Sequence, residues 1–472
     1  MKNNLLLGNG VNIQFGGKAY SSEFIMKRMK FNALLDHYDQ LFEDTVNGKE
    51  LSGLFNAFVE IANQIKNGEY DDVIPEEERD VIDAVEEFKN RYTWRIEQPQ
   101  DVMLEDWFLL LEVFILANPV FIPQKTDLTQ GFERLILDAI YNDGKVQEIY
   151  KKMGRNAKRF FSSFDSIFTL NYDNNIERLT GKTVYHLHGD YSVLSDSENP
   201  DCVQGYLRKE HGERVLVSGW EHCFCNALLN YSGKLKLERA DLNHQAIELS
   251  STWKDVYSKP DSIDAIKKIN ENAAQIIQGK IEHPDLYIAS EYHFNTLRNI
   301  SGVLSIVGIS PNNDNHIFGI IKNNPSIEKI VYYYFSDADR ESASALFGIE
   351  KCMCLPVVDL WKELKCSQKT YKCIYHDLPK VIPTLGQAIS DLSGDNISND
   401  KLIQEVNRIP QFELDRLTRL VDAHMKEFNV QTRTKEEFDK QRWSISYIAL
   451  QEGIHPAVLL TAYIMNTKTR NH

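Results

Sequence analysis

Two apolar runs that each end in a polar side chain constrain the fold of this chain more than any other feature. Residues 166–190 read SIFTLNYDNNIERLTGKTVYHLHGD, where Asn171 follows the first run and His188 follows the second. The 17 positions from one to the other leave room for a short helix between two adjacent parallel strands. Open α/β sheets bind ligands at the carboxyl ends of their strands, so both side chains are predicted to line a ligand site.

Two more apolar runs end in glycine turns, one at the N-terminus and one much later in the chain. Three leucines at 5–7 lead into GNG at 8–10, and the run VLSIVGIS at 303–310 ends in a glycine and a serine. Glycines adopt backbone conformations closed to other residues and leave space for a phosphate to approach main-chain N–H groups. The next glycine after the first turn, Gly16, stands six residues after Gly10, unlike the Gly-x-Gly-x-x-Gly of ordinary dinucleotide folds.

The alternation of apolar runs and helical patterns predicts a doubly wound, mostly parallel α/β sheet that occupies residues 1–365. Apolar residues recur at helical spacing between the first glycine turn and Asn171, so a helical insertion is expected at about 25–160. Such an insertion can act as a lid or an oligomer contact, although core packing explains its apolar stripes equally well. Residues 366–400 are expected to be a polar connector, and residues 401–472 a C-terminal α-helical interaction domain.

The last helical pattern is interrupted by Gly453 and Pro456, which predicts a pair of helices joined by a turn. A protein-interaction or oligomerisation role is favoured for this pair over DNA binding, because no basic surface accompanies it. The net charge of −15 also argues against a broad nucleic-acid-binding face.

Bulk properties predict a cytoplasmic protein. The longest apolar stretch, 102–118, contains three acidic residues, so no membrane span is expected. No N-terminal signal pattern precedes the first strand. The seven cysteines form no disulfide-like framework, which fits a reducing compartment.

Four motifs follow one another along the chain: GNGVN at 8–12, TLNYD at 169–173, LHG at 187–189 and GIS at 308–310. In this order they resemble the motifs of the sirtuin family and, more closely, of its bacterial antiphage relatives. The N-terminal stretch LLLGNGVNIQFGGKAYSSEF is also similar to the AbiH group of phage abortive-infection proteins. The resemblance implies a Rossmann-like, sirtuin-type sheet that binds NAD.

The resemblance also implies roles for individual residues. His188 matches the catalytic histidine of the family, and Asn171 matches the asparagine that binds the nicotinamide ribose and orients the attacking water. A carboxylate near the sugar, such as that of Asp173, would stabilise the positive charge that develops there. The expected NAD-binding residues are Gly8, Asn9, Gly10, Asn12, Gly16, Asp173, Gly308 and Ser310.

The chain departs from the sirtuin deacylases in its cysteines. Deacylases carry two Cys-x-x-Cys pairs that hold a structural zinc, whereas this chain has two Cys-x-Cys pairs and no Cys-x-x-Cys. We therefore expect no metal, and water rather than an acyl-lysine as the acceptor. The expected activity is cleavage of NAD+ to nicotinamide and ADP-ribose, by a regulated, NAD-depleting effector of antiphage abortive infection.

Such an activity requires control, because an enzyme that always consumed NAD would kill its own cell. We expect a homo-oligomer, or a complex with a companion defence protein that acts as activator or inhibitor. The alternative function is a non-catalytic sensor that binds NAD, ADP-ribose or a related nucleotide, and a lysine deacylase is a third option.

Several of these residues also have local interpretations. Asn171 can cap a helix that starts at Tyr172, and Ser310 can cap a helix that begins with the proline after it. His186 and His188 alternate along one strand face, which makes a metal-binding pair conceivable, although spacing supplies no third ligand.

Overall fold

The structure, a computed structural model, describes most of the chain. The described residues are 2–34, 48–192, 219–230, 232–257, 262–269, 274, 278, 292–366, 397–428 and 435–470. They belong to two compact units. The first comprises Met1–Phe15 and Ala33–Cys366, and the second comprises Gly16–Asn32 and Ser367–His472.

The first unit is built on a sheet of six parallel strands in the order β3-β2-β1-β4-β5-β6. The strands are β1 (Asn3–Leu7), β2 (Ser166–Thr169), β3 (Tyr185–His186), β4 (Gly302–Val307), β5 (Ile327–Tyr334) and β6 (Cys352–Pro356). The chain adds β2 and β3 on one side of β1, then returns to add β4, β5 and β6 on the other side. The prediction of a doubly wound parallel α/β sheet is therefore confirmed for the described residues.

The reversal of strand order places three strand ends at one level. Leu7, the last residue of β1, pairs with Thr169 at the end of β2 and with Val307 at the end of β4. The loops that leave these strands therefore start side by side, at the topological switch point where folds of this class bind ligands. The two central strands, β1 and β4, carry buried apolar residues on both faces, because helices cover the sheet on each side.

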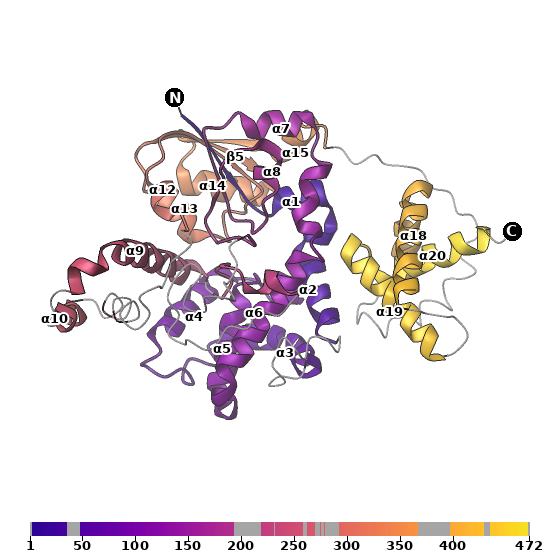
Figure 1. Ribbon diagram of the computed structural model, residues 1–472, viewed down its shortest axis with the longest axis horizontal. Helices are drawn as coiled ribbons and strands as arrows, with labels where there is room; N and C mark the ends of the chain where they lie inside the picture. The colour runs from indigo at the N-terminus through magenta and orange to yellow at the C-terminus, as the bar shows by residue number, and fades with distance from the viewer. Residues whose placement is uncertain are drawn as a thin grey trace. The chain divides into compact units, whose positions relative to one another are not determined.

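Helices lie on both faces of this sheet. In Figure 1, α12 to α14 lie on one side of it, and α1, α7, α8 and α15 on the other. Their bounds are α1 (Gly10–Gly16), α7 (Arg155–Ser162), α8 (Asn175–Thr180), α12 (Phe294–Arg298), α13 (Asn315–Lys322), α14 (Asp337–Phe347) and α15 (Val357–Glu363).

The region predicted to be a helical insertion forms helices with a core of their own. The rings of Phe55, Phe58, Trp107 and Phe132 pack with centroids 5.4 to 6.4 Å apart, so these apolar stripes serve core packing. The long helices are α3 (Gly48–Lys66), α4 (Arg79–Arg91), α5 (Asp106–Ala117) and α6 (Lys125–Tyr141). The remaining elements of the unit are η3 (Pro99–Asp101), η4 (Pro119–Gln124), η5 (Lys145–Lys152), η6 (Glu221–Phe224), α9 (Gly233–Tyr257) and α10 (Ser262–Ile269).

The second unit combines an N-terminal segment with the C-terminal helices. Its elements are η1 (Lys18–Tyr20), α2 (Ser22–Asn32), α17 (Asn399–Asn407), α18 (Gln411–Glu427), α19 (Lys435–Glu452) and α20 (Pro456–Arg470). The predicted helix break is confirmed, since α19 ends before Gly453 and α20 begins at Pro456. The buried Arg28 guanidinium donates to the Leu450 carbonyl at 2.9 Å, and the Phe31 and Trp443 rings lie 4.8 Å apart. The prediction that the C-terminal domain consists of residues 401–472 therefore omits residues 16–32, which belong to the same unit. Most of the predicted connector, 366–400, lies outside the described residues.

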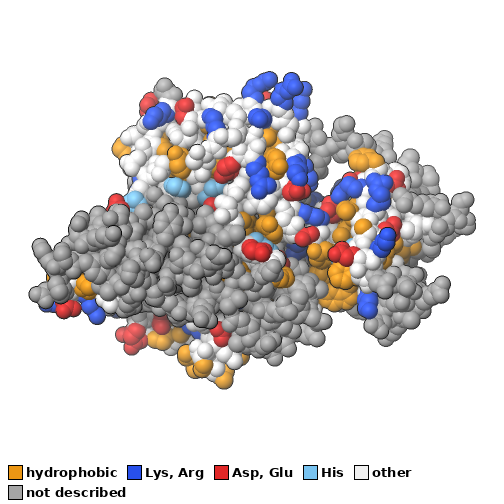
Figure 2. All heavy atoms as spheres, viewed as in Figure 1, with side chains coloured by type: hydrophobic (Ala, Val, Ile, Leu, Met, Phe, Trp, Pro, Cys, Tyr) orange, Lys and Arg blue, Asp and Glu red, His pale blue; other side chains and the backbone are white. Residues whose placement is uncertain are grey.

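Figure 2 shows how charge is distributed over one face of the molecule. Described Lys and Arg side chains gather mainly over α7, and elsewhere on this face they are interspersed with Asp and Glu. Among the described residues, no single helix combines the length and apolar character that crossing a membrane requires.

Candidate functional site

The two glycine turns pack directly against each other at the switch point. The N–H groups of Gly8 and Gly10 donate to the carbonyl oxygens of Val307 and Gly308, both at 3.0 Å. A Cβ on Gly10 would lie 2.6 Å from the Cα of Gly308, and Gly308 has a φ of +74°. These glycines are required because two backbones approach so closely. The N–H groups of Gly8 and Gly10, which could have donated to a phosphate, therefore form hydrogen bonds between the two turns.

The other residues of the predicted pyrophosphate loop have different surroundings. Asn9 is exposed in the turn, whereas Gly16 ends helix α1, about 9 Å along the helix axis from Gly10. Asn12, inside α1, is buried, and its side-chain amide donates to the Asp173 carboxylate at 2.6 Å. The turn itself therefore consists of residues 8–10, and Asn12 connects α1 to the loop after β2.

Asn171 lies at the end of β2 beside the first glycine turn. Its Nδ2 donates to the Gly8 carbonyl at 3.2 Å, and its backbone N–H donates to Thr169 Oγ1 at 3.1 Å. Helix α8 begins at Asn175 with Asn174 in the N-cap position, so the interpretation of Asn171 as a helix cap is wrong. Its side chain is oriented by the glycine turn and is partly exposed.

The carboxylate of Asp173 is buried and accepts hydrogen bonds from two elements. Asn12 donates to one oxygen, and the backbone N–H of Asn175 donates to the other at 3.1 Å, together with the Asn175 side chain. Burial raises the pKa of Asp173, while the hydrogen bonds from Asn12 and Asn175 oppose that rise. Asp173 therefore connects α1 to the start of α8 and holds the Asn171 loop in place.

His186 at the end of β3 is held by two acceptors. Its Nδ1 lies 2.9 Å from the Asn171 carbonyl oxygen, and its Nε2 lies 2.6 Å from Glu177 Oε1. Burial lowers the pKa of His186, but the hydrogen bond and negative charge of Glu177 outweigh burial, so the pKa is raised overall. Because both ring nitrogens are engaged, the suggested metal pair of His186 with His188 does not form.

His188 instead pairs with a histidine from the other half of the sheet. Its Nε2 lies 3.2 Å from Nε2 of His316 at the start of α13, and the two rings stack with centroids 5.4 Å apart. The His188 side chain is only 2% exposed. Burial, together with the charge of Lys236, lowers the pKa of both histidines well below the ordinary value. Both rings are therefore neutral near pH 7, and one N–H is shared between them.

Asp314 completes a group of three chemically reactive side chains with these histidines. One ligand atom from each of His188, Asp314 and His316 lies within 4.8 Å of the others, a geometry that could hold a metal ion. Burial raises the pKa of Asp314 to about 7, although the charge of Lys236 opposes the rise. The buried Lys236 ammonium is paired with Glu105 at 3.3 Å. The charge of Lys236 lowers the pKa of all three groups, while the charge of Glu105 raises that of Asp314.

The loop after β4 contradicts one of its two sequence interpretations, the helix start capped by Ser310. The Ser310 hydroxyl donates to Asp339 Oδ1 at 2.9 Å. Helix α13 begins at Asn315 with Asp314 in the N-cap position, so the prediction that Ser310 caps this helix is wrong. Nδ1 of His316 is buried and has no hydrogen-bond partner among the residues that the structure describes, which is common where a ligand or water completes a site.

The sequence analysis did not predict three residues of this site: Lys236, Asp314 and His316. His316 follows a strand end in the run NNDNH, which is a weak signal of polar side chains after an apolar run. No spacing rule joins it to His188, 128 positions away. Hydrogen bonds nevertheless connect the carboxyl ends of β1, β2, β3 and β4 into one continuous arrangement.

Comparisons with known proteins add no identification to this geometry. Searches against protein-family models, curated proteins and solved structures each found no match.

Proposed function

We propose that this protein is a NAD+ glycohydrolase that cleaves the nicotinamide–ribose bond with water. The observation that carries this proposal is the hydrogen bond from Asn171 to the first glycine turn, with His188 following the neighbouring strand β3, at the switch point of a doubly wound sheet. Folds of this class bind nucleotides at that position. The amide and the imidazole supply the two polar functions that glycosidic cleavage by water requires.

The reaction consumes one water and releases nicotinamide, ADP-ribose and a proton. As the bond from ribose C1′ to the nicotinamide nitrogen breaks, positive charge develops on the sugar, and water attacks C1′. The Asn171 amide, oriented by its bond to Gly8, positions this water and a ribose hydroxyl. His188 is the proposed acceptor of the proton that the water loses, once opening of the site relieves the burial that lowers its pKa.

His316 assists as a positioning residue. Its Nε2 holds the His188 ring in one orientation at 3.2 Å.

The proposed enzyme is regulated. The His188 side chain is almost wholly buried, so the substrate can reach it only after part of the surrounding structure moves. This burial supports a resting state that an activating partner, a companion defence protein or self-assembly converts to the active state. The proposed biological role is depletion of cellular NAD during antiphage abortive infection.

The test is NAD+ hydrolysis by the purified chain, alone and with the products of neighbouring genes or of an infecting phage. Release of nicotinamide and ADP-ribose is expected under an activating condition and should be lost in Asn171→Ala and His188→Ala. Asn299→Ala, an exposed asparagine after α12, is the matched control and should retain activity. Hydrolysis that persists in both site variants would refute the assignment of the residues. Calorimetric binding of NAD without turnover under any of these conditions would establish the sensor function instead.

A further inference from the structure

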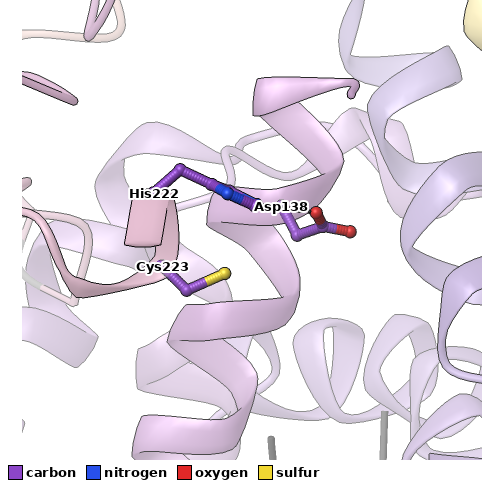
Figure 3. A group of neighbouring side chains, drawn as sticks. All are labelled: Asp138, His222 and Cys223. Atoms are coloured by element: carbon purple, nitrogen blue, oxygen red, sulfur yellow. Dashed lines mark hydrogen bonds and ion pairs between the residues drawn. The ribbon is translucent and has the colours of Figure 1, made fainter. Parts of the chain in front are cut away.

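A second group of potential ligands lies between helix α6 and the 3-10 helix η6. Asp138 belongs to α6, and His222 and Cys223 are neighbours in η6 (Figure 3). One ligand atom from each lies within 4.8 Å of the others. Nε2 of His222 is 2.8 Å from Asp138 Oδ1, and in Figure 3 the His222 ring and the Cys223 sulfur both project from η6 toward α6.

The three side chains form a ligand set that suits zinc. Imidazole nitrogen, thiolate sulfur and carboxylate oxygen bind Zn²⁺ at about 2.0 to 2.3 Å, so tetrahedral ligands lie about 3.3 to 3.6 Å apart. Side-chain movements of about 1 Å would bring the present atoms to that spacing around a common centre. Three protein ligands leave a fourth position for water. Metals that prefer only sulfur ligands, and metals that prefer only oxygen ligands, fit this mixed set less well.

We propose that Asp138, His222 and Cys223 bind a zinc ion that fastens η6 to α6. On binding, the Cys223 thiol gives its proton to solvent and its sulfur bonds to zinc, while the neutral His222 ring and the Asp138 carboxylate donate lone pairs. The thiolate and carboxylate charges together balance the charge of the ion. The absence of Cys-x-x-Cys pairs led us to expect no metal. The ligands proposed here come instead from two segments that lie far apart in the sequence, so no such pair marks them.

An ordinary ion pair is the competing explanation. His222 is already paired with Asp138, and its ring stacks on Tyr141 with centroids 4.0 Å apart and an interplanar angle of 11°. The Cys223 thiol is buried beside that pair and donates to the Arg134 carbonyl oxygen at 3.5 Å, a hydrogen bond that metal binding would replace. The stacking also fixes the plane of the imidazole, as the neighbours of metal-binding histidines do.

The ion would stabilise a segment that supports the His188 turn. Just after η6, the Leu228 N–H donates to the His188 carbonyl at 2.9 Å, and Asn226 Oδ1 accepts from the Asp190 N–H at 2.8 Å. Zinc bound at η6 would therefore hold the chain that packs against the backbone of His188. This inference does not depend on NAD hydrolysis.

The experiment measures metal content in the full chain, produced in zinc-supplemented medium and purified without a histidine tag. Elemental analysis should find about one zinc per chain, and Cys223→Ser and His222→Asn should each retain less than about a tenth of it. Cys225→Ser, a buried cysteine two residues on, is the matched control and should retain the zinc. His188→Asn should retain it too, because the other three-residue group is separate from this one.

Cobalt provides a second measurement on the unmodified chain. Co²⁺ substituted for zinc should give a thiolate-to-metal charge-transfer band in the near ultraviolet, and Cys223→Ser should abolish this band while circular dichroism remains unchanged. A wild-type chain without zinc and without the cobalt band would overturn the proposal. Loss of zinc from Cys225→Ser or His188→Asn, with retention in Cys223→Ser, would also overturn it.

Discussion

Replacing Gly308 by alanine tests whether the two glycine turns pack as closely as the structure indicates. The residue has a φ of +74°, which costs an L-residue about 1–2 kcal/mol. Its new Cβ would lie 2.9 Å from the Val11 nitrogen and 3.0 Å from the Gly10 Cα. These are backbone atoms that cannot rotate away, so overpacking adds about 1–3 kcal/mol. We therefore expect Gly308→Ala to lower the free energy of unfolding of the first unit by about 2–5 kcal/mol.

Gly319→Ala is the matched control, since it makes the same chemical change in α13. Among the residues that the structure describes, a Cβ at Gly319 would meet no atom within 4 Å apart from its chain neighbours and the backbone of its own helix, α13. Alanine there should raise the free energy of unfolding by up to about 1 kcal/mol. The two substitutions should therefore have opposite signs.

The chain contains two units, so a single global unfolding curve would mix their transitions. Hydrogen exchange measured by mass spectrometry in increasing urea, on peptides that cover β1 and β4, reports the first unit by itself. A loss smaller than about 0.5 kcal/mol for Gly308→Ala, or losses of equal size for both variants, would refute the close packing of the turns.

Three further predictions concern buried polar side chains. Asn12→Asp places a second carboxylate against Asp173, so it should lower the stability of the first unit at pH 7 by about 1–3 kcal/mol. The loss should shrink as pH falls and the pair takes up a proton, which hydrogen exchange on the β1 and β4 peptides at several pH values would show. Glu177→Gln removes the charge that raises the pKa of His186. The destabilisation of the first unit, followed by hydrogen exchange in urea, should be greatest below the unfolded-state pKa of about 6.5 and should vanish as pH rises above the folded-state pKa. An unchanged difference at high pH would contradict the ion pair. His316→Phe removes the hydrogen-bond partner of His188 and should cost about 1–3 kcal/mol by the same hydrogen-exchange measurement in urea, while the corresponding glutamine variant should lose less.

Local sequence patterns predicted the parallel sheet, the position of Asn171 and His188 after strand ends, and the helix break at Gly453. These features follow from apolar runs and turn residues, whose effect extends over only a few positions. The same reasoning gave the wrong helix starts after β2 and β4. Suitable capping residues stood at both places, but hydrogen bonds to distant segments used Asn171 and Ser310 instead.

The sequence by itself therefore determined the parallel α/β sheet and the strand ends that carry polar side chains. Only the tertiary structure decided which distant side chains meet there: His316 with His188, Asn12 with Asp173, and His222 with Asp138. It also decided that residues 16–32 join the C-terminal helices. The physical reason is that strand and helix signals are local, whereas these partners are chosen by packing between segments separated by tens to hundreds of residues.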